Sequence, residues 1–177
     1  RQEMLQQQAW DTSRLLQHGR NAHAVLAPKQ LVERRLAHKK IGQGLAPNFG
    51  QDRLNYYEPR SLLTSLDLGG LGFSFPAALG AQLAAPNRPV VNFNGDGGFL
   101  FNAQEFSTAV EYNPPVISVV INNGSWGSEK AYQRYAFNER YVGADTNNPR
   151  YDKFAELFGG TGFYVERPED IGNAFLE

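Results

Sequence analysis

The chain lacks cysteine, an excess of either charge and any long apolar run. The absence of cysteine excludes disulfide bridges and thiolate metal sites. Its 17 basic and 18 acidic side chains leave a net charge of −1, which predicts no affinity for nucleic acid or a membrane surface. The longest apolar stretch, Phe73 to Ala85, is interrupted by Ser74 and Gln82 and is too short to cross a bilayer. Since the first residues also lack a signal-peptide core, we expect a cytoplasmic protein.

The 177 residues, 41% hydrophobic and 20% charged, are enough for one buried globular domain. Charge is uneven along the chain. Residues 1–40 hold eight Lys and Arg against three Asp and Glu, giving +5, so the remaining residues carry −6. We expect residues 1–55 to be a leader of weak helices up to about Arg35 and loop from residue 42, with residues 56–177 as the domain. A basic arm that binds an acidic partner is the alternative reading of the leader.

Alternating strand and helix patterns predict an α/β fold. Val90–Phe93 and Val116–Ile121 are continuous apolar runs, typical of strands buried on both faces in a parallel sheet with helices on both faces. Asn102 and Glu105 have the spacing of a capping box for a helix over Ala103–Glu111. We expect Phe106, Ala109 and Val110 to form the buried face of that helix. The other predicted elements are strands at Ser61–Leu66 and Phe163–Val165, and helices at Ala77–Ala84, from Ser128, at Arg150–Phe158 and from Pro168.

Glycine-rich turns follow the two strongest strands. The first is Asn94-Gly95-Asp96-Gly97-Gly98, and the second is Asn122-Asn123-Gly124. In a parallel βαβ unit both strand ends open on the same edge of the sheet. A carboxylate and an amide oxygen suit a hard divalent cation, and glycine N–H groups suit phosphate oxygens. The pattern therefore predicts a metal bound by Asp96 and Asn123 that bridges to a diphosphate.

Twenty-four residues, from Gly98 to Ile121, separate the Gly-Asp-Gly triplet from the asparagine pair. With this spacing the sequence resembles the thiamine diphosphate-dependent enzymes, the family of acetolactate synthase and pyruvate decarboxylase, in their C-terminal diphosphate-binding domain. The resemblance runs from about Pro59 to Phe175 and implies the thiamin diphosphate-binding fold. Family members continue past the last helix into another strand, so we expect a C-terminally truncated domain or a fragment.

The resemblance also implies a ligand set and a cofactor. The Ser125 carbonyl would be the third ligand of Mg²⁺, after Asp96 and Asn123. Leu71 would prop thiamine diphosphate in its bent shape, or it could be a plain core leucine, and the Gly69 carbonyl would accept a hydrogen bond from the aminopyrimidine. Trp126 would line the cofactor site and the entrance for the substrate, or it would only pack against neighbouring side chains. The remaining cofactor-binding candidates are glycines whose N–H groups would face the diphosphate: Gly95, Gly97, Gly98, Gly124 and Gly127.

No catalytic residue is expected in this chain. In the family a glutamate from a pyrimidine-binding domain, normally in a partner subunit, activates the cofactor, and no glutamate here matches that motif. The resemblance therefore implies a lyase or transferase, a 2-oxoacid decarboxylase or carboligase of the acetolactate synthase type, that acts on a small 2-oxoacid or aldehyde. It would need a pyrimidine-binding domain or subunit and would form a homo- or hetero-oligomer.

Other functions stay open. Ser125–Lys130 and Phe137–Arg140 are similar to the sulfoacetaldehyde acetyltransferase branch of the family. The chain could also be an orphan or truncated domain that binds cofactor without turnover, or one subunit of a split enzyme. A phosphotransferase with Asp96 as nucleophile is disfavoured, because residues 94 and 98 are Asn and Gly where a second carboxylate is needed.

Overall fold

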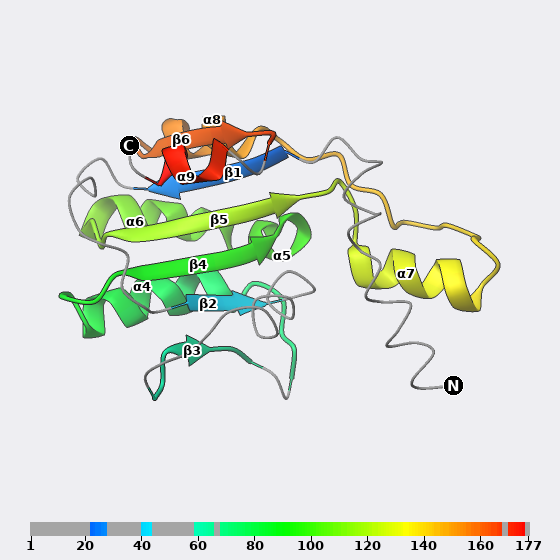
Figure 1. Cartoon of the computed structure of the whole chain (residues 1–177), viewed down its shortest axis with the longest axis horizontal. Helices are drawn as coiled ribbons and strands as arrows, with labels where there is room; N and C mark the ends of the chain where they lie inside the picture. The colour runs from blue at the N-terminus through cyan, green and yellow to red at the C-terminus, as the bar shows by residue number, and fades with distance from the viewer. Residues whose placement is uncertain (1–21, 28–39, 44–58, 66–67, 168–169, 176–177) are drawn as a thin grey trace.

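The computed structural model describes residues 22–27, 40–43, 59–65, 68–167 and 170–175. Among them is one six-stranded sheet with the strand order β3-β2-β4-β5-β1-β6 (Figure 1). The strands are β1 (Ala22–Ala27), β2 (Lys40–Gln43), β3 (Leu62–Leu63), β4 (Val90–Gly95), β5 (Val116–Asn122) and β6 (Thr161–Val165).

The centre of the sheet is parallel. β2 pairs in parallel with both β3 and β4, and β4 pairs in parallel with β5 from Val90 opposite Val116 to Gly95 opposite Ile121. β1 is antiparallel to both of its neighbours, β5 and β6, so β6 runs in the same direction as β5. The predicted α/β fold with a parallel sheet is confirmed, and β1 adds one antiparallel strand to it.

Two of these strands correct our expectations for the leader. Residues 22–27 were predicted helical and form β1, whereas residues 42 and 43, the start of the predicted loop, belong to β2. Both segments are short, and what makes them strands is pairing with β5, β6 and β4 from elsewhere in the chain. The rest of the leader, residues 1–21, 28–39 and 44–58, lies outside the described residues.

The helices follow the strands in the predicted order. α8 begins two residues after Pro149, and α6 ends at Tyr112 with Asn113 in the left-handed conformation (φ 49°). The helix α5 was not predicted. It begins at Asp96, within the segment that was predicted to be a glycine-rich turn. The helical elements are α4 (Ser74–Ala84), α5 (Asp96–Leu100), the 3₁₀ turn η1 (Ala103–Glu105), α6 (Phe106–Tyr112), α7 (Gly127–Ala136), α8 (Tyr151–Leu157) and α9 (Ile171–Ala174).

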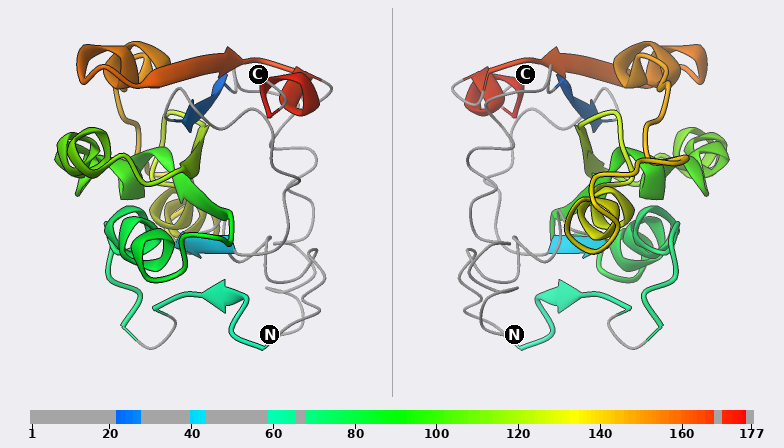
Figure 2. Two further views of the ribbon diagram at one scale, coloured as in Figure 1. Left: turned by 90° about the vertical axis from the view of Figure 1, so that its left-hand side faces the viewer. Right: turned by 90° about the vertical axis from the view of Figure 1, so that its right-hand side faces the viewer.

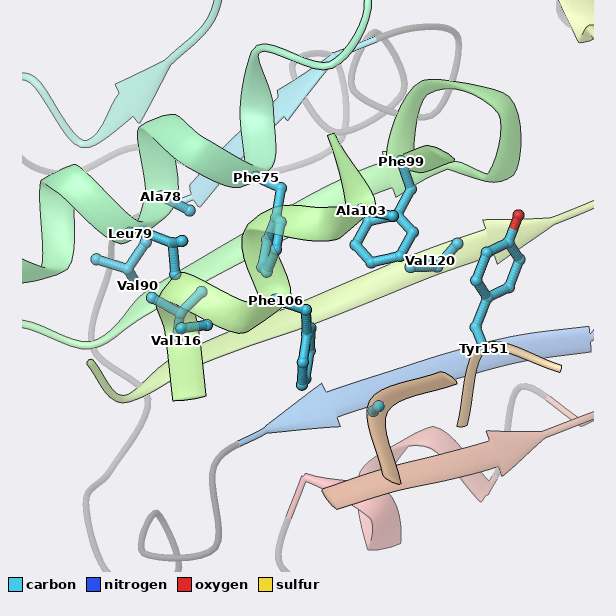
Figure 3. Packing of buried hydrophobic residues seen from close by; sticks show 12 residues of the cluster. Phe75, Ala78, Leu79, Val90, Phe99, Ala103, Phe106, Val116, Val120 and Tyr151 are labelled. Carbon is cyan, nitrogen blue, oxygen red and sulfur yellow. The ribbon is translucent and has the colours of Figure 1, made fainter. Parts of the chain in front are cut away.

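Helices cover both faces of the sheet, as expected. α4, α6 and α8 lie on one face and α9 on the other (Figure 2). Side chains alternate along β5, so Val116 and Val120 join the first core cluster while Ile117 and Val119 join the second. The first cluster is rich in aromatic rings, which pack between the helices and the sheet (Figure 3). This burial on both faces explains why β5 is apolar up to Ile121 except at Ser118.

The capping box predicted before α6 is absent. The Asn102 side chain does not cap the helix but donates from Nδ2 to the Gly72 carbonyl over 3.0 Å. Glu105 accepts a hydrogen bond of 2.9 Å from the Thr108 hydroxyl instead. Because a 3₁₀ turn precedes α6 and the helix is seated by Phe106 and Ala109, Val110 is 40% exposed rather than buried. The prediction for Val110 was wrong, and those for Phe106 and Ala109 are confirmed.

α7 projects away from the sheet beyond the end of β5 (Figure 1) and has no buried residue. The segment that follows it returns alongside, where the Gln133 amide exchanges two hydrogen bonds with the main chain of Val142, at 2.9 and 2.7 Å. Within the described residues, no helix has both the length and the apolar character needed to cross a membrane.

Candidate functional site

The ends of β4 and β5 meet at one edge of the sheet. Gly95, the last residue of β4, pairs with Ile121, the penultimate residue of β5. Asp96 opens α5 directly after Gly95, and Asn122 to Ser125 form the turn that leaves β5 (Figure 1). The geometric expectation that the two glycine-rich turns lie side by side is therefore met.

The Asp96 carboxylate is buried between these turns, with the residue only 3% exposed. Its Oδ2 accepts hydrogen bonds from the Gly124 N–H (3.0 Å), the Asn148 amide (2.5 Å) and the Thr146 hydroxyl (3.5 Å). Burial raises the pKa of Asp96, and this effect outweighs the opposing hydrogen bonds, of which the one from the Gly97 N–H is the largest. All of these donors are neutral, so they orient the carboxylate without neutralising its charge.

Asn123 and Ser125 lie in the same turn as the Gly124 N–H. The Asn123 Oδ1 atom accepts hydrogen bonds from the main-chain N–H of Ser125 (3.1 Å) and from its hydroxyl (3.2 Å). Gly124, between them, has φ +65°, a conformation that favours glycine. Two of the three predicted metal ligands, Asn123 and Ser125, are thus the chain neighbours of Gly124. The N–H of Gly124 contacts the third predicted ligand, Asp96.

Trp126 packs directly on Gly97. A Cβ atom at Gly97 would lie 2.6 Å from Cζ3 of the Trp126 ring, which leaves no room for a side chain there. The ring also meets Phe101 edge-on, with a centroid separation of 5.9 Å. The turn after β5 is therefore held against α5 by an aromatic ring as well as by the Asp96 hydrogen bonds, and Gly127 then begins α7.

The loop before α4 reaches the same region. The Gly72 carbonyl accepts the hydrogen bond from Asn102, and a Cβ atom at Gly98 would lie 3.9 Å from Cδ2 of Leu71. Leu71 is 40% exposed, so the alternative of a plain core leucine is wrong. Gly69 has φ +57°, and a Cβ atom there would meet no atom within 4 Å. Leu71 from this loop thus lies beside Gly98 of the turn after β4.

Polar side chains line β4 on the way to Asp96. Asn92 and Asn94 are buried on the face that α4 covers; Asn92 donates to the Ser118 hydroxyl over 2.9 Å, and Asn94 accepts from the Ser74 hydroxyl. These bonds tie β4 to β5 and to the start of α4. The strand that positions Asp96 is consequently held by the neighbouring strand β5 and by the helix α4.

Sequence reasoning missed the segment before α8. Residues 144–146 run along the turn after β5, where the Trp126 N–H donates to the Ala144 carbonyl (2.8 Å) and the Thr146 N–H donates to the Gly124 carbonyl (2.9 Å). Asn148 then reaches Asp96 with its amide. Nothing local in the sequence predicts this contact, because Asn148 and Asp96 are 52 positions apart.

The described residues contain no group of three or more His, Cys, Asp or Glu side chains that could hold a metal. A cation site in this part of the chain would therefore combine the Asp96 carboxylate with amide, hydroxyl or carbonyl oxygens. Such an oxygen-rich set suits Mg²⁺ or Ca²⁺ better than a transition metal.

The family model for the C-terminal TPP binding domain of thiamine pyrophosphate enzymes matches residues 42–177. The chain belongs to this family. This confirms the resemblance to thiamine diphosphate-dependent enzymes that was inferred from the turns after β4 and β5. It also confirms the α/β TPP-binding fold. The matched segment begins at residue 42, within the range we assigned to the leader.

Similar proteins include two kinds of named enzyme. The sulfoacetaldehyde acetyltransferase of Castellaniella defragrans is 36% identical over 121 residues, covering 68% of this chain and 20% of that protein. The acetolactate synthase large subunit of Haemophilus influenzae is 33% identical over 175 residues, covering 95% of this chain and 30% of that protein.

A solved structure is also similar, the thiamine diphosphate-dependent 4-hydroxybenzoylformate decarboxylase of Rhodococcus jostii RHA1. It matches with a TM-score of 0.70 and 26% identity, covering 85% of this chain and 27% of that chain. This chain thus spans less than a third of the length of each of these relatives.

Proposed function

We propose that this chain binds thiamine diphosphate and Mg²⁺ as the diphosphate-side domain of a 2-oxoacid decarboxylase or carboligase of the acetolactate synthase type. The observation that carries the proposal is the buried Asp96 carboxylate, held by the Gly124 N–H where β4 and β5 end together. Family membership supports the cofactor, and the chemistry of the donors supports the metal.

The residues present fit a hard divalent cation. Asp96 would supply a carboxylate oxygen, Asn123 an amide oxygen and Ser125 its main-chain carbonyl. Burial of Asp96 among neutral donors makes its negative charge unfavourable, and a bound cation would offset that cost. The negative diphosphate would in turn need the cation, since the carboxylate alone would repel it.

The glycines of the two turns fit a diphosphate. Gly95, Gly97 and Gly98 would let phosphate oxygens approach main-chain N–H groups closely, and Gly124 and Gly127 would do the same from the other turn. At Gly97 the Trp126 ring occupies the space where a side chain would stand. Gly97 is therefore required for packing as well, and both roles exclude other residues there.

The thiamine end of the cofactor would meet Gly69, Leu71 and Trp126. The exposed side chain of Leu71 would support the bent cofactor, and the Gly69 carbonyl would accept its amino group. Thiamine diphosphate, when bound, supplies the electron sink for making or breaking a bond beside a carbonyl group. The residues of this chain bind and orient it, whereas the activating glutamate comes from a pyrimidine-binding domain.

The proposed substrate is a small 2-oxoacid or aldehyde, and the proposed assembly is an oligomer in the cytoplasm that includes a pyrimidine-binding domain or subunit. Relatives named acetolactate synthase and decarboxylase support this substrate class. An acyltransferase is the second candidate, because two of the similar proteins are sulfoacetaldehyde acetyltransferases at 36% identity. Both candidate functions are compatible with a domain that binds the cofactor but converts no substrate on its own.

Calorimetric titration of the chain with thiamine diphosphate tests the proposal. We expect binding with Mg²⁺ present and little binding after chelation with EDTA. Asp96→Ala should abolish the Mg²⁺-dependent part, whereas Asp170→Ala, at the start of α9 on the other face of the sheet, should bind like the wild type. Undiminished Mg²⁺-dependent binding by Asp96→Ala would overturn the metal assignment.

A further inference from the structure

Four groups form a closed hydrogen-bonded ring at the edge of the sheet. The two acceptors are Oδ2 of Asp96 and Oδ1 of Asn122, and the two donors are the Gly124 N–H and the Asn148 amide. Gly124 donates to Asp96 over 3.0 Å and to Asn122 over 3.2 Å. The Asn148 Nδ2 atom donates to Asp96 over 2.5 Å and to Asn122 over 2.8 Å. Each donor thus bridges the end of β4 and the end of β5.

The chemistry of the ring fixes the orientation of the Asn148 amide. A reversed amide would turn its oxygen toward two acceptor oxygens, whereas the observed one directs an NH₂ group with two hydrogens at them. The Asn148 Oδ1 atom is buried and has no hydrogen-bond partner among the described residues. The side chain therefore gives up one hydrogen bond in order to make the two that bridge the turns.

The neighbouring residues hold the same point of the chain. The Thr146 hydroxyl also contacts Oδ2 of Asp96, and the Tyr151 hydroxyl donates to the main-chain carbonyl of Asp96 over 3.2 Å. The segment from Thr146 to Tyr151 therefore fixes both the side chain and the main chain of Asp96. Within that segment, the side-chain amide of Asn148 bridges the Asp96 and Asn122 side chains. Thr146 also reaches both turns, but it meets the second one through its main-chain N–H, which donates to the Gly124 carbonyl.

Resting on the proposed function, we propose that Asn148 is a positioning residue for the cation site. Its amide holds Asp96 against the turn that carries Asn123 and Ser125, so that the ligands are spaced for the cation before it binds. Hydrogen bonds of this kind orient ligating carboxylates in metal sites, and their loss typically weakens metal binding by about 10- to 100-fold.

The test is a titration of the full chain with Mn²⁺ at saturating thiamine diphosphate, followed by electron paramagnetic resonance. Asn148→Leu keeps similar volume and removes both donors. We expect it to bind Mn²⁺ about 10- to 100-fold more weakly than the wild type and to alter the spectrum of the bound ion. The matched control is Asn147→Leu, at the exposed neighbouring position, which should behave like the wild type.

Asn122→Ala removes the acceptor at the other end of the Asn148 bridge. If Asn148→Leu does not fold, the same Mn²⁺ titration is made with Asn122→Ala. In a double-mutant cycle, Asn148→Leu should cost less in the Asn122→Ala background than in the wild type, because the bridge is already broken. Additive losses, or wild-type Mn²⁺ affinity and spectrum in Asn148→Leu with only a lower unfolding midpoint, would overturn the positioning role. If the wild type itself binds no Mn²⁺ with thiamine diphosphate, the proposed function fails and the inference with it.

Discussion

The hydroxyl of Tyr151 donates a hydrogen bond of 3.2 Å to the main-chain carbonyl of Asp96, which lies 55 positions earlier in the chain. Tyr151 is 2% exposed and meets the ring of Phe99 edge-on (Figure 3). Burial, together with the nearby charge of Asp96, raises the pKa of Tyr151, so its hydroxyl stays protonated and can donate. The first residue of α8 thus anchors the first residue of α5.

Tyr151→Phe should lower the free energy of unfolding by about 1 kcal/mol, because the buried carbonyl of Asp96 loses the hydrogen bond from the hydroxyl. The ring would keep its contact with Phe99. Urea denaturation measures the change, and Tyr132→Phe on the exposed side of α7 serves as control. Equal stability of the two variants would show that the bond to Asp96 contributes nothing.

Gly97→Ala should destabilise the chain by about 1–3 kcal/mol, because the added methyl group would overlap the Trp126 ring. The expected cause is testable by a second substitution. Trp126→Ala made in the Gly97→Ala background should recover part of the loss. Gly80→Ala, where a Cβ atom meets open space in α4, is the matched control and should be neutral or stabilising. Thermal unfolding measures the three variants against the wild type, and an unchanged midpoint for Gly97→Ala would contradict the contact between Gly97 and Trp126.

Leu71→Ala should reduce the activity of an enzyme reconstituted with the proposed pyrimidine-binding domain more than it reduces diphosphate binding. The reason is that Leu71 is exposed beside Gly98 and would support the thiamine end of the cofactor. Its effect on folding should be small. Leu79→Ala, which empties a 4% exposed core position, should instead cost about 2–5 kcal/mol of stability. Equal losses of activity and cofactor binding by Leu71→Ala would argue against the supporting role.

The Arg150–Asp152 pair should make stability depend on pH in acid. Both hydrogen bonds of the pair, at 2.8 and 2.7 Å, join the guanidinium to the carboxylate and lower the pKa of Asp152 below its ordinary value of 3.8. A carboxylate with a lowered folded-state pKa stabilises the fold above its unfolded-state pKa, and this is lost as pH falls through the folded-state value.

Asp152→Asn should therefore lose stability relative to the wild type near neutral pH, and the difference should shrink as pH falls below about 4. The free energy of unfolding from urea titrations between neutral pH and about pH 2 measures this. A difference that stays constant over the whole range would mean that the charge of Asp152 contributes no stability.

Local sequence determined the strands that carry the site. The apolar runs before Asp96 and Asn122 predicted β4 and β5, and the βαβ rule then placed the two turns side by side, as the Gly95–Ile121 pairing shows. The helix prediction after Asp96 was less complete. α5 was missed because its first residues, Asp96-Gly97-Gly98, favour a turn, and it is held as a helix by the packing of Phe99 in the core.

By itself, then, the sequence determined the parallel β4–β5 pair and the meeting of the Asp96 and Asn123 turns, because these follow from periodicity and spacing within residues 90–125. The family was indicated by the resemblance of those two turns to a known motif pair, and the family model confirms it. Only the tertiary structure decided that β1 pairs antiparallel with β5 and β6, and that Asn148 and Tyr151 hold Asp96. Those contacts join segments more than 50 positions apart or strands whose partners lie far along the chain. Their formation depends on how helices and strands pack together, which no local pattern encodes.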